Sequence, residues 1–131
     1  MGAKRILVVD NESYVREVTQ ISLQMMAGWE VTTAGSGQEA LEKAAIESPD
    51  AILLDLMMPD MDGMTTLQHL QSQPETSHIP VIFMTGQANQ PTDYADPDLA
   101  VTGFVSKPFD PLQLANQIAN ILSWDLDSPS A

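Results

Sequence analysis

Cysteine is absent from this 131-residue sequence, which excludes disulfides, thiol chemistry and zinc sites with cysteine ligands. Basic residues are few: five lysines and arginines stand against 18 acidic residues, for a formal charge of −13. Such a surface repels phosphate backbones and anionic lipids, so we expect no direct binding to nucleic acid or membranes. No apolar run approaches the roughly 20 residues of a membrane span. Residues 1–5 carry charge, but no long apolar region with a small-residue cleavage site follows them, so we expect no signal peptide. A cytoplasmic location is therefore expected.

The length suits one domain, and 44% of the residues are hydrophobic, enough for a full core. We expect this domain to span residues 1–123. Residues 124–131 would form a polar tail or the start of a linker.

Two short apolar runs end abruptly in a carboxylate: residues 5–10 end in Asp10, and the run that begins at Ile52 ends in Asp55. Runs of this length, bounded by polar or turn residues, predict strands buried on both faces. An aspartate at the end of such a strand lies at the carboxyl edge of a parallel sheet, where ligands bind in open α/β folds. We therefore take Asp55 as the candidate reactive residue.

Helical patterns separate the predicted strands. Ser13 is a candidate N-cap for a helix that Gly28 ends, and Ser36 with Glu39 forms a capping box. Asp110 is expected to cap a last helix that opens at Pro111. The expected strands are residues 5–10, 29–34, 52–55, 79–84 and 101–106.

Five strands alternating with helices predict an α/β fold, a single doubly wound (βα)5 domain. The compact solution at this size is a parallel five-stranded sheet of order 2-1-3-4-5. The fourth helix would fall in Gln87–Leu99, where Pro91 and Pro97 predict a short or distorted helix.

Two other stretches match known motifs only in part. Residues 35–40 match the G-x-G-x-x-A dinucleotide fingerprint, but the capping box explains them and the chain leaves little room for a second half-fold. Residues 60–63 resemble a calcium loop, but His69 stands where the closing glutamate should be. His69 and His78 show no metal-binding pattern and are expected on the surface.

In the predicted strand order, Asp10, Asn11 and Asp55 meet at one edge of the sheet. Their oxygen atoms favour a hard cation, and Mg²⁺ is the expected one. A carboxylate can serve as a nucleophile toward a phosphoryl group. Thr85 and Lys107, at the ends of the next two strands, could hydrogen-bond and neutralise that group.

These residues stand in four motifs that lie in order along the chain. Together the motifs resemble the response-regulator receiver domains of two-component signalling, which have a CheY-like fold. The resemblance covers essentially the whole chain from Arg5 to about Ser123. The motifs are VVDNE (8–12), LDLMMPDMDG (54–63), MTG (84–86) and GFVSKPF (103–109).

The resemblance implies a phospho-accepting signalling domain rather than an enzyme, with only self-phosphorylation and self-dephosphorylation chemistry. It implies a phosphohistidine donor on a sensor histidine kinase or a histidine phosphotransfer protein, and a downstream effector that the sequence does not name. A homodimer is left open. The implied roles are phospho-acceptor for Asp55, Mg²⁺ ligands for Asp10, Asn11, Asp55 and the Met57 backbone carbonyl, phosphoryl binding for Thr85 and Lys107, and a switch pair for Thr85 and Phe104.

Two departures from the family pattern, Asn11 and the segment 87–99, carry predictions, and so does the identity of residue 57. Asn11 replaces a usual carboxylate, so weaker Mg²⁺ binding is expected. Met57 stands where side chains lean over the phosphoryl group, so slow self-dephosphorylation is expected. The proline-bearing segment 87–99 replaces the usual fourth helix, which would alter the usual signalling face.

Two other functions remain as alternatives. One is a degenerate receiver that acts as a phosphorylation-independent interaction module. The other is a small metal-dependent phosphohydrolase with Asp55 as nucleophile, against which the absence of a substrate-binding insertion argues. Phe104 is equally compatible with a switch role and with simple core packing.

Overall fold

The computed structural model describes residues 4–56, 58, 63–85, 102–106 and 109–124. Within them, strands and helices alternate up to β4. The elements are β1 (Arg5–Val9), α1 (Ser13–Ala27), β2 (Glu30–Ala34), α2 (Gly37–Glu47), β3 (Ala51–Asp55), α3 (Gly63–Gln71), β4 (Val81–Thr85), β5 (Gly103–Ser106) and α4 (Leu114–Leu122).

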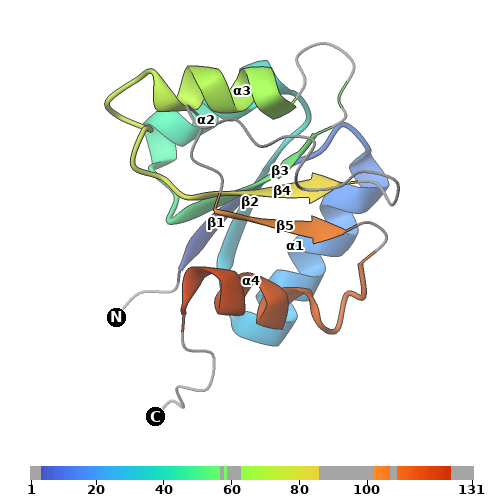
Figure 1. The fold of residues 1–131 in the computed structure, drawn as a ribbon. Helices are drawn as coiled ribbons and strands as arrows, with labels where there is room; N and C mark the ends of the chain where they lie inside the picture. Colours follow the sequence, from blue (N-terminus) through green and yellow to red (C-terminus); the bar gives the residue numbers. More distant parts are fainter. Residues whose placement is uncertain (1–3, 57, 59–62, 86–101, 107–108, 125–131) are drawn as a thin grey trace.

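All five strands are parallel, and their order is β2-β1-β3-β4-β5, which confirms the predicted fold and strand order. Helices α2 and α3 cover one face of the sheet, and α1 and α4 cover the other (Figure 1). The order places β1 and β3 side by side, although α1, β2 and α2 separate them in the chain.

The core has two layers because successive strand residues point to opposite faces. In β1, Ile6 and Val8 pack on the α1/α4 side, whereas Leu7 and Val9 pack on the α2/α3 side. All four are essentially inaccessible to solvent. Continuous apolar runs, rather than alternating ones, are what a strand covered on both faces requires.

The ends of α1 and α2 follow the sequence signals with one correction. Ser36 Oγ accepts a hydrogen bond from the Glu39 backbone N–H at 3.1 Å, which confirms the predicted cap of α2. Gly28 ends α1 with a φ of 70°. The prediction that Ser13 is the N-cap of α1 was wrong: Glu12 holds that position. Asp10 already accepts the Glu12 backbone N–H, so the chain enters the helix one residue earlier.

The last helix also begins later than predicted. Asp110 Oδ1 accepts the backbone N–H of Leu112 at 2.9 Å, but this bond caps a separate turn over residues 111–113. Helix α4 itself starts at Leu114, so the expectation that Pro111 opens it was wrong.

Beyond the end of α4, the Trp124 ring lies edge-on to Trp29 with centroids 5.3 Å apart. Trp124 is partly buried and packs against the α1/α4 core layer.

The predicted short or distorted helix in residues 87–99 lies outside the described residues. Among the residues that are described, no helix is long and apolar enough to cross a membrane.

Candidate functional site

The carboxyl ends of the strands bring the predicted acidic residues to one edge. Strands β1 and β3 pair through Val9 and Leu54, and Asp10 and Asp55 come one position later. On the other side of β3, Asp55 pairs with Met84, and Thr85 follows as the last residue of β4. The sequence-based expectation that these chain positions converge is therefore met for the two aspartates and for the backbone of Thr85.

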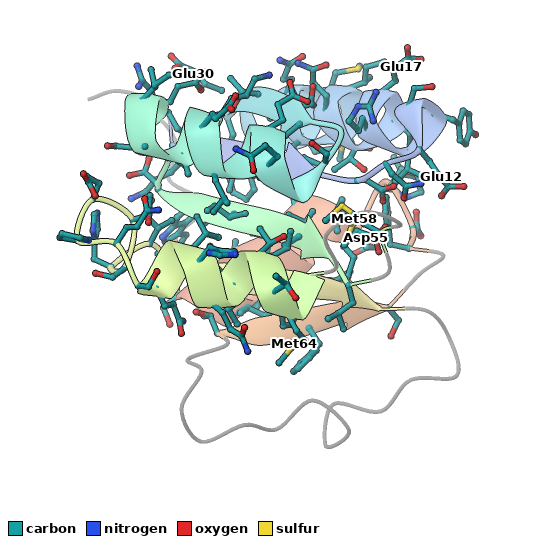
Figure 2. The ribbon with its side chains drawn as sticks, turned by 90° about the horizontal axis from the view of Figure 1, so that it is seen from above. Glu12, Glu17, Glu30, Asp55, Met58 and Met64 are labelled. Atoms are coloured by element: carbon teal, nitrogen blue, oxygen red, sulfur yellow. The ribbon has the colours of Figure 1, made fainter. Side chains whose placement is uncertain are left out.

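Both aspartates are buried: the exposed fraction is 0% for Asp10 and 4% for Asp55. Figure 2 shows Asp55 at the end of the sheet, with Glu12, at the start of α1, on the same side. Two acidic groups rarely share a buried edge without compensation by a cation or by hydrogen bonds. The arrangement suits an oxygen-ligand cation site.

Asp10 is held from three directions. Its backbone N–H donates to the Ala34 carbonyl at 3.1 Å, and its Oδ1 accepts the Glu12 backbone N–H at 2.9 Å. Arg16 Nη1 donates to its backbone carbonyl at 2.7 Å. This turn leaves Asn11 exposed at the rim. An amide there offers a neutral oxygen to an ion and adds no charge.

A second polar group lies next to this turn. Glu39 Oε1 accepts the Gly35 backbone N–H at 2.8 Å, and Glu39 Oε2 lies 3.2 Å from Lys43 Nζ. The bond from Gly35 lowers the pKa of Glu39; burial opposes it, while Lys43 and Arg16 lower the pKa further. Lys43 Nζ also donates to the Thr33 carbonyl.

Gly63, the first residue of α3, packs against the backbone of the candidate acceptor. A Cβ there would lie 2.7 Å from the Asp55 carbonyl oxygen and 2.8 Å from Leu56 Cα. The Gly63 backbone N–H donates to the Leu56 carbonyl at 3.0 Å. Nearby, Met58 is buried in the α2/α3 core layer. The chain returns so closely past Asp55 that only glycine fits without displacement.

Phe104 lies partly buried on the α2/α3 side of β5. Its ring centroid is 5.9 Å from that of Phe83, with the ring planes tilted by 43°. Phe83 is fully buried in β4. The contact between the Phe104 and Phe83 rings is part of the core. The switch role of Phe104 remains a prediction.

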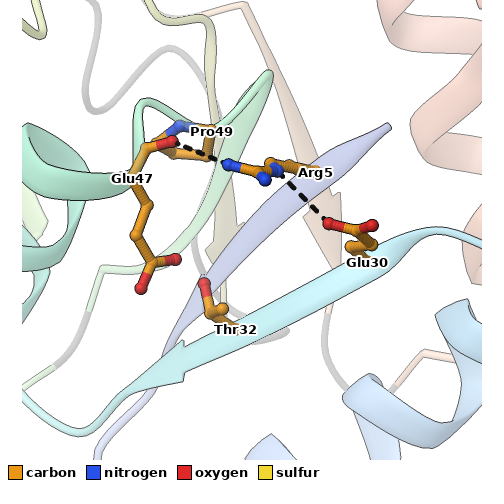
Figure 3. A pocket seen from close by; sticks show the side chains of 5 residues that line it. All are labelled: Arg5, Glu30, Thr32, Glu47 and Pro49. Atoms are coloured by element: carbon orange, nitrogen blue, oxygen red, sulfur yellow. Dashed lines mark hydrogen bonds and ion pairs between the residues drawn. The ribbon is translucent and has the colours of Figure 1, made fainter. Parts of the chain in front are cut away.

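Two hollows are lined by residues that the structure describes. A groove of about 440 Å³ lies between β5 and α4, and the residues that line it are Phe104, Val105, Ser106, Phe109, Asp110, Gln117, Asn120 and Ile121. A smaller pocket of about 300 Å³ opens at the amino ends of β1 and β2 around Arg5 (Figure 3). There Arg5 Nε pairs with Glu30 Oε1 at 3.2 Å, and Nη1 donates to the Glu47 carbonyl at 3.3 Å. That exposed ion pair lies at the opposite end of the sheet from Asp55.

The described residues hold only part of the predicted site. Met57 and Lys107, and the side chain of Thr85, lie outside the described part of the chain. Within the described part, no group of three or more histidine or acidic side chains could hold a metal ion. A metal site here would rest on the two aspartates together with neutral oxygen donors. His69 and His78 are exposed, as expected.

Comparison with known proteins identifies the family. The response regulator receiver domain family matches residues 6–119, and the chain belongs to it. It is therefore a receiver domain of two-component systems, a class of signalling domain. This confirms the resemblance carried by the four motifs.

Curated proteins of similar sequence are named as regulators. The chain is 37% identical over 122 residues to a probable transcriptional regulator ycf27 of Cyanophora paradoxa, covering 93% of this chain and 49% of that protein. It is 34% identical over 119 residues to the alkaline phosphatase synthesis transcriptional regulatory protein PhoP of Bacillus subtilis, covering 91% and 48%. The chain thus spans about half the length of these curated relatives.

The solved structures show the same fold. The chemotaxis protein CheY4 of Vibrio cholerae superimposes with a TM-score of 0.83 at 29% identity, covering 92% of this chain and 99% of that one. A putative response regulator from Chloroflexus aurantiacus gives 0.82 at 31% identity, covering 92% and 98%.

Three residues at or near the site were assigned no role from the sequence: Arg16, Gly63 and Phe83. Arg16 was counted only as one of few cations. Gly63 was noticed only as part of a motif, and Phe83 only as a strand residue. Their roles depend on contacts between segments far apart in the chain, which local patterns do not reveal.

Proposed function

We propose that this chain accepts a phosphoryl group on Asp55 from a phosphohistidine of a sensor histidine kinase or a histidine phosphotransfer protein. The observation that carries the proposal is the pair of buried aspartates, Asp10 and Asp55, that end neighbouring strands at the carboxyl edge of a receiver fold. A carboxylate oxygen of Asp55 attacks the phosphorus, the N–P bond breaks, and the imidazole leaves with a proton.

The donor set fits Mg²⁺. Two buried carboxylates and the amide of Asn11 offer hard oxygen ligands, and the backbone carbonyl of Met57 is a fourth protein ligand that the family resemblance implies. When bound, Mg²⁺ would neutralise charge on the carboxylates and on the incoming phosphoryl group. Asp10 orients its carboxylate through the Glu12 N–H, so it is preorganised for such a site.

Other residues complete the proposed chemistry. Lys107 follows β5 directly and would pair with the phosphoryl oxygens, and the Thr85 hydroxyl would hydrogen-bond one of them. Met57 would hinder an attacking water and slow the loss of phosphate. The Phe104 ring would respond to Thr85, which would make the groove between β5 and α4 part of the face that a partner recognises.

The downstream effector is proposed to act in gene regulation. The names of PhoP and ycf27, both transcriptional regulators, support this, while the chain itself spans about half of each.

The experiment is to incubate the chain with acetyl phosphate and Mg²⁺ and to measure intact mass, with Asp55→Asn as the variant. We expect a phosphoryl adduct that needs both Mg²⁺ and Asp55. The matched control is Asp50→Asn, a carboxylate at the opposite sheet edge whose loss should leave the adduct unchanged. An adduct that persists in Asp55→Asn would contradict the assignment.

A second candidate is the degenerate receiver that binds partners without phosphorylation, favoured by the neutral, exposed Asn11. The absence of an adduct with acetyl phosphate, together with the absence of amide shifts with beryllofluoride and Mg²⁺, would support this candidate. Turnover of free phosphoesters would instead support the phosphohydrolase.

A further inference from the structure

The side chain of Arg16 joins helix α1 back to the strand end that carries the candidate metal ligands. Its Nη1 donates to the backbone carbonyl of Asp10 at 2.7 Å. The bond crosses six positions and is partly buried. Charge-assisted bonds of this kind are shorter and stronger than neutral ones, and partial burial reduces their competition with water.

The Arg16 guanidinium packs closely against Gly35. A Cβ at Gly35 would lie 3.1 Å from Arg16 Nη1 and 3.5 Å from its Cζ, so Arg16 lies directly over the glycine after β2. Glu39 Oε1 would lie 3.7 Å from the same Gly35 Cβ position. The positive charge of Arg16 therefore lies at the Asp10 carbonyl and near the anionic Glu39, whose pKa it helps to lower.

The turn itself is tight. Asp10 Oδ1 is engaged by the Glu12 N–H, and the Glu12 carbonyl accepts the Arg16 N–H at 3.1 Å. Arg16 thus contacts the turn at both ends, through its backbone at Glu12 and through its side chain at Asp10. Asn11 lies between them, exposed and without a side-chain bond of its own among the described contacts.

From these contacts we infer that Arg16 is a positioning residue that holds the Asp10–Glu12 turn in a shape ready to bind a divalent cation. Arg16 carries only donors and cannot itself be a ligand. It would act by reducing the ordering that Asp10 and Asn11 must undergo on binding. The inference rests on the proposed function, because it assumes that the cation binds at this turn.

The test is an Mg²⁺ titration of the full chain followed by amide NMR shifts. We expect Arg16→Ala to bind Mg²⁺ about tenfold more weakly and Arg16→Lys to recover part of the loss. The matched control is Arg5→Ala, since Arg5 also donates to a backbone carbonyl but at the opposite sheet edge. Its Mg²⁺ affinity should equal that of the wild type.

Two further readouts separate positioning from general stability. At saturating Mg²⁺, the rate of phosphorylation by acetyl phosphate should return to the wild-type value in Arg16→Ala, because only the half-saturating Mg²⁺ concentration changes. Without Mg²⁺, amide exchange at Glu12 should accelerate more than exchange in the β3 core.

The outcomes are distinct. If the wild type binds Mg²⁺ and Arg16→Ala binds it equally well, this inference is overturned and the proposed function stands. If Arg16→Ala accelerates exchange in β3 as much as at Glu12, its role is general stability and the inference is also overturned. A wild type that binds no Mg²⁺ would overturn both proposals.

Discussion

Gly63 lies so close to Asp55 that a single added methyl group would meet the Asp55 carbonyl oxygen at 2.7 Å. The start of α3 is thereby packed onto the backbone of the candidate acceptor. The side chain of Phe83 closes the same space, at 3.2 Å from that Cβ position. The geometry of the acceptor depends on a residue eight positions later in the chain.

Gly63→Ala should therefore lower the free energy of unfolding by about 1–3 kcal/mol, because backbone atoms cannot move aside as easily as side chains. It should also slow phosphorylation of Asp55. The control is Gly103→Ala, whose Cβ would lie nearest to side-chain atoms of Ile121, the closest at 2.6 Å, rather than to backbone atoms. Urea unfolding checks this, and a larger loss at Gly103 than at Gly63 would contradict the argument.

Phe83 and Phe104 should be energetically coupled, because their rings touch across neighbouring strands. In a double-mutant cycle with leucine at each position, we expect a coupling energy of about 0.5–1.5 kcal/mol. The measurement is urea unfolding of the two single variants and the double variant. Additive effects would mean that Phe104 packs independently of Phe83.

Thr19 is a fully buried residue of α1 whose hydroxyl has no hydrogen-bond partner in the described part of the chain. Thr19→Val keeps the shape and removes the buried hydroxyl, so it should stabilise the fold by about 1 kcal/mol.

Thr76 is the matched control, because it is also buried but its Oγ1 donates to the Leu70 carbonyl at 2.6 Å. Thr76→Val should destabilise the fold by about 1–3 kcal/mol. Thermal or urea unfolding gives both values. Equal effects of the two substitutions would show that the hydroxyl at position 19 is satisfied.

The pKa of Glu39 is lowered chiefly by the Gly35 N–H. A group with a lowered folded-state pKa stabilises the fold above its unfolded pKa, and this contribution is lost as the pH falls through the folded value. An NMR titration should therefore give a Glu39 midpoint below the ordinary 4.5. Lys43→Met should raise this midpoint, whereas an unchanged midpoint would exclude a contribution from the Lys43 charge.

Asn11→Asp should bind Mg²⁺ about tenfold more tightly, because it adds a negative charge at the rim of the site. The control is Asn116→Asp, which makes the same charge change on the exposed face of α4. An Mg²⁺ titration measures both. Affinity that is unchanged in Asn11→Asp would mean that Asn11 does not contribute to the site.

The α/β class, the parallel sheet and its order were predictable because strand signals here are local. Each strand is a continuous apolar run with a clear end, and runs such as 52–55 need cover on both faces. Helix ends were less predictable. Ser13 and Pro111 carry genuine cap signals, but Asp10 and the 111–113 turn compete for the same backbone groups.

The sequence by itself determined which chemical groups are available: carboxylates at two strand ends, an amide after the first of them, and a surface with few cations. The apolar pattern also determined that those strand ends share one edge. Only the tertiary structure decided how they are held. The bond from Arg16 to Asp10, the fit of Gly63 against Asp55 and the contact between Phe83 and Phe104 all join segments that pack together only once the sheet has formed. Short-range patterns record local backbone preference, whereas these contacts depend on the register and spacing of neighbouring elements.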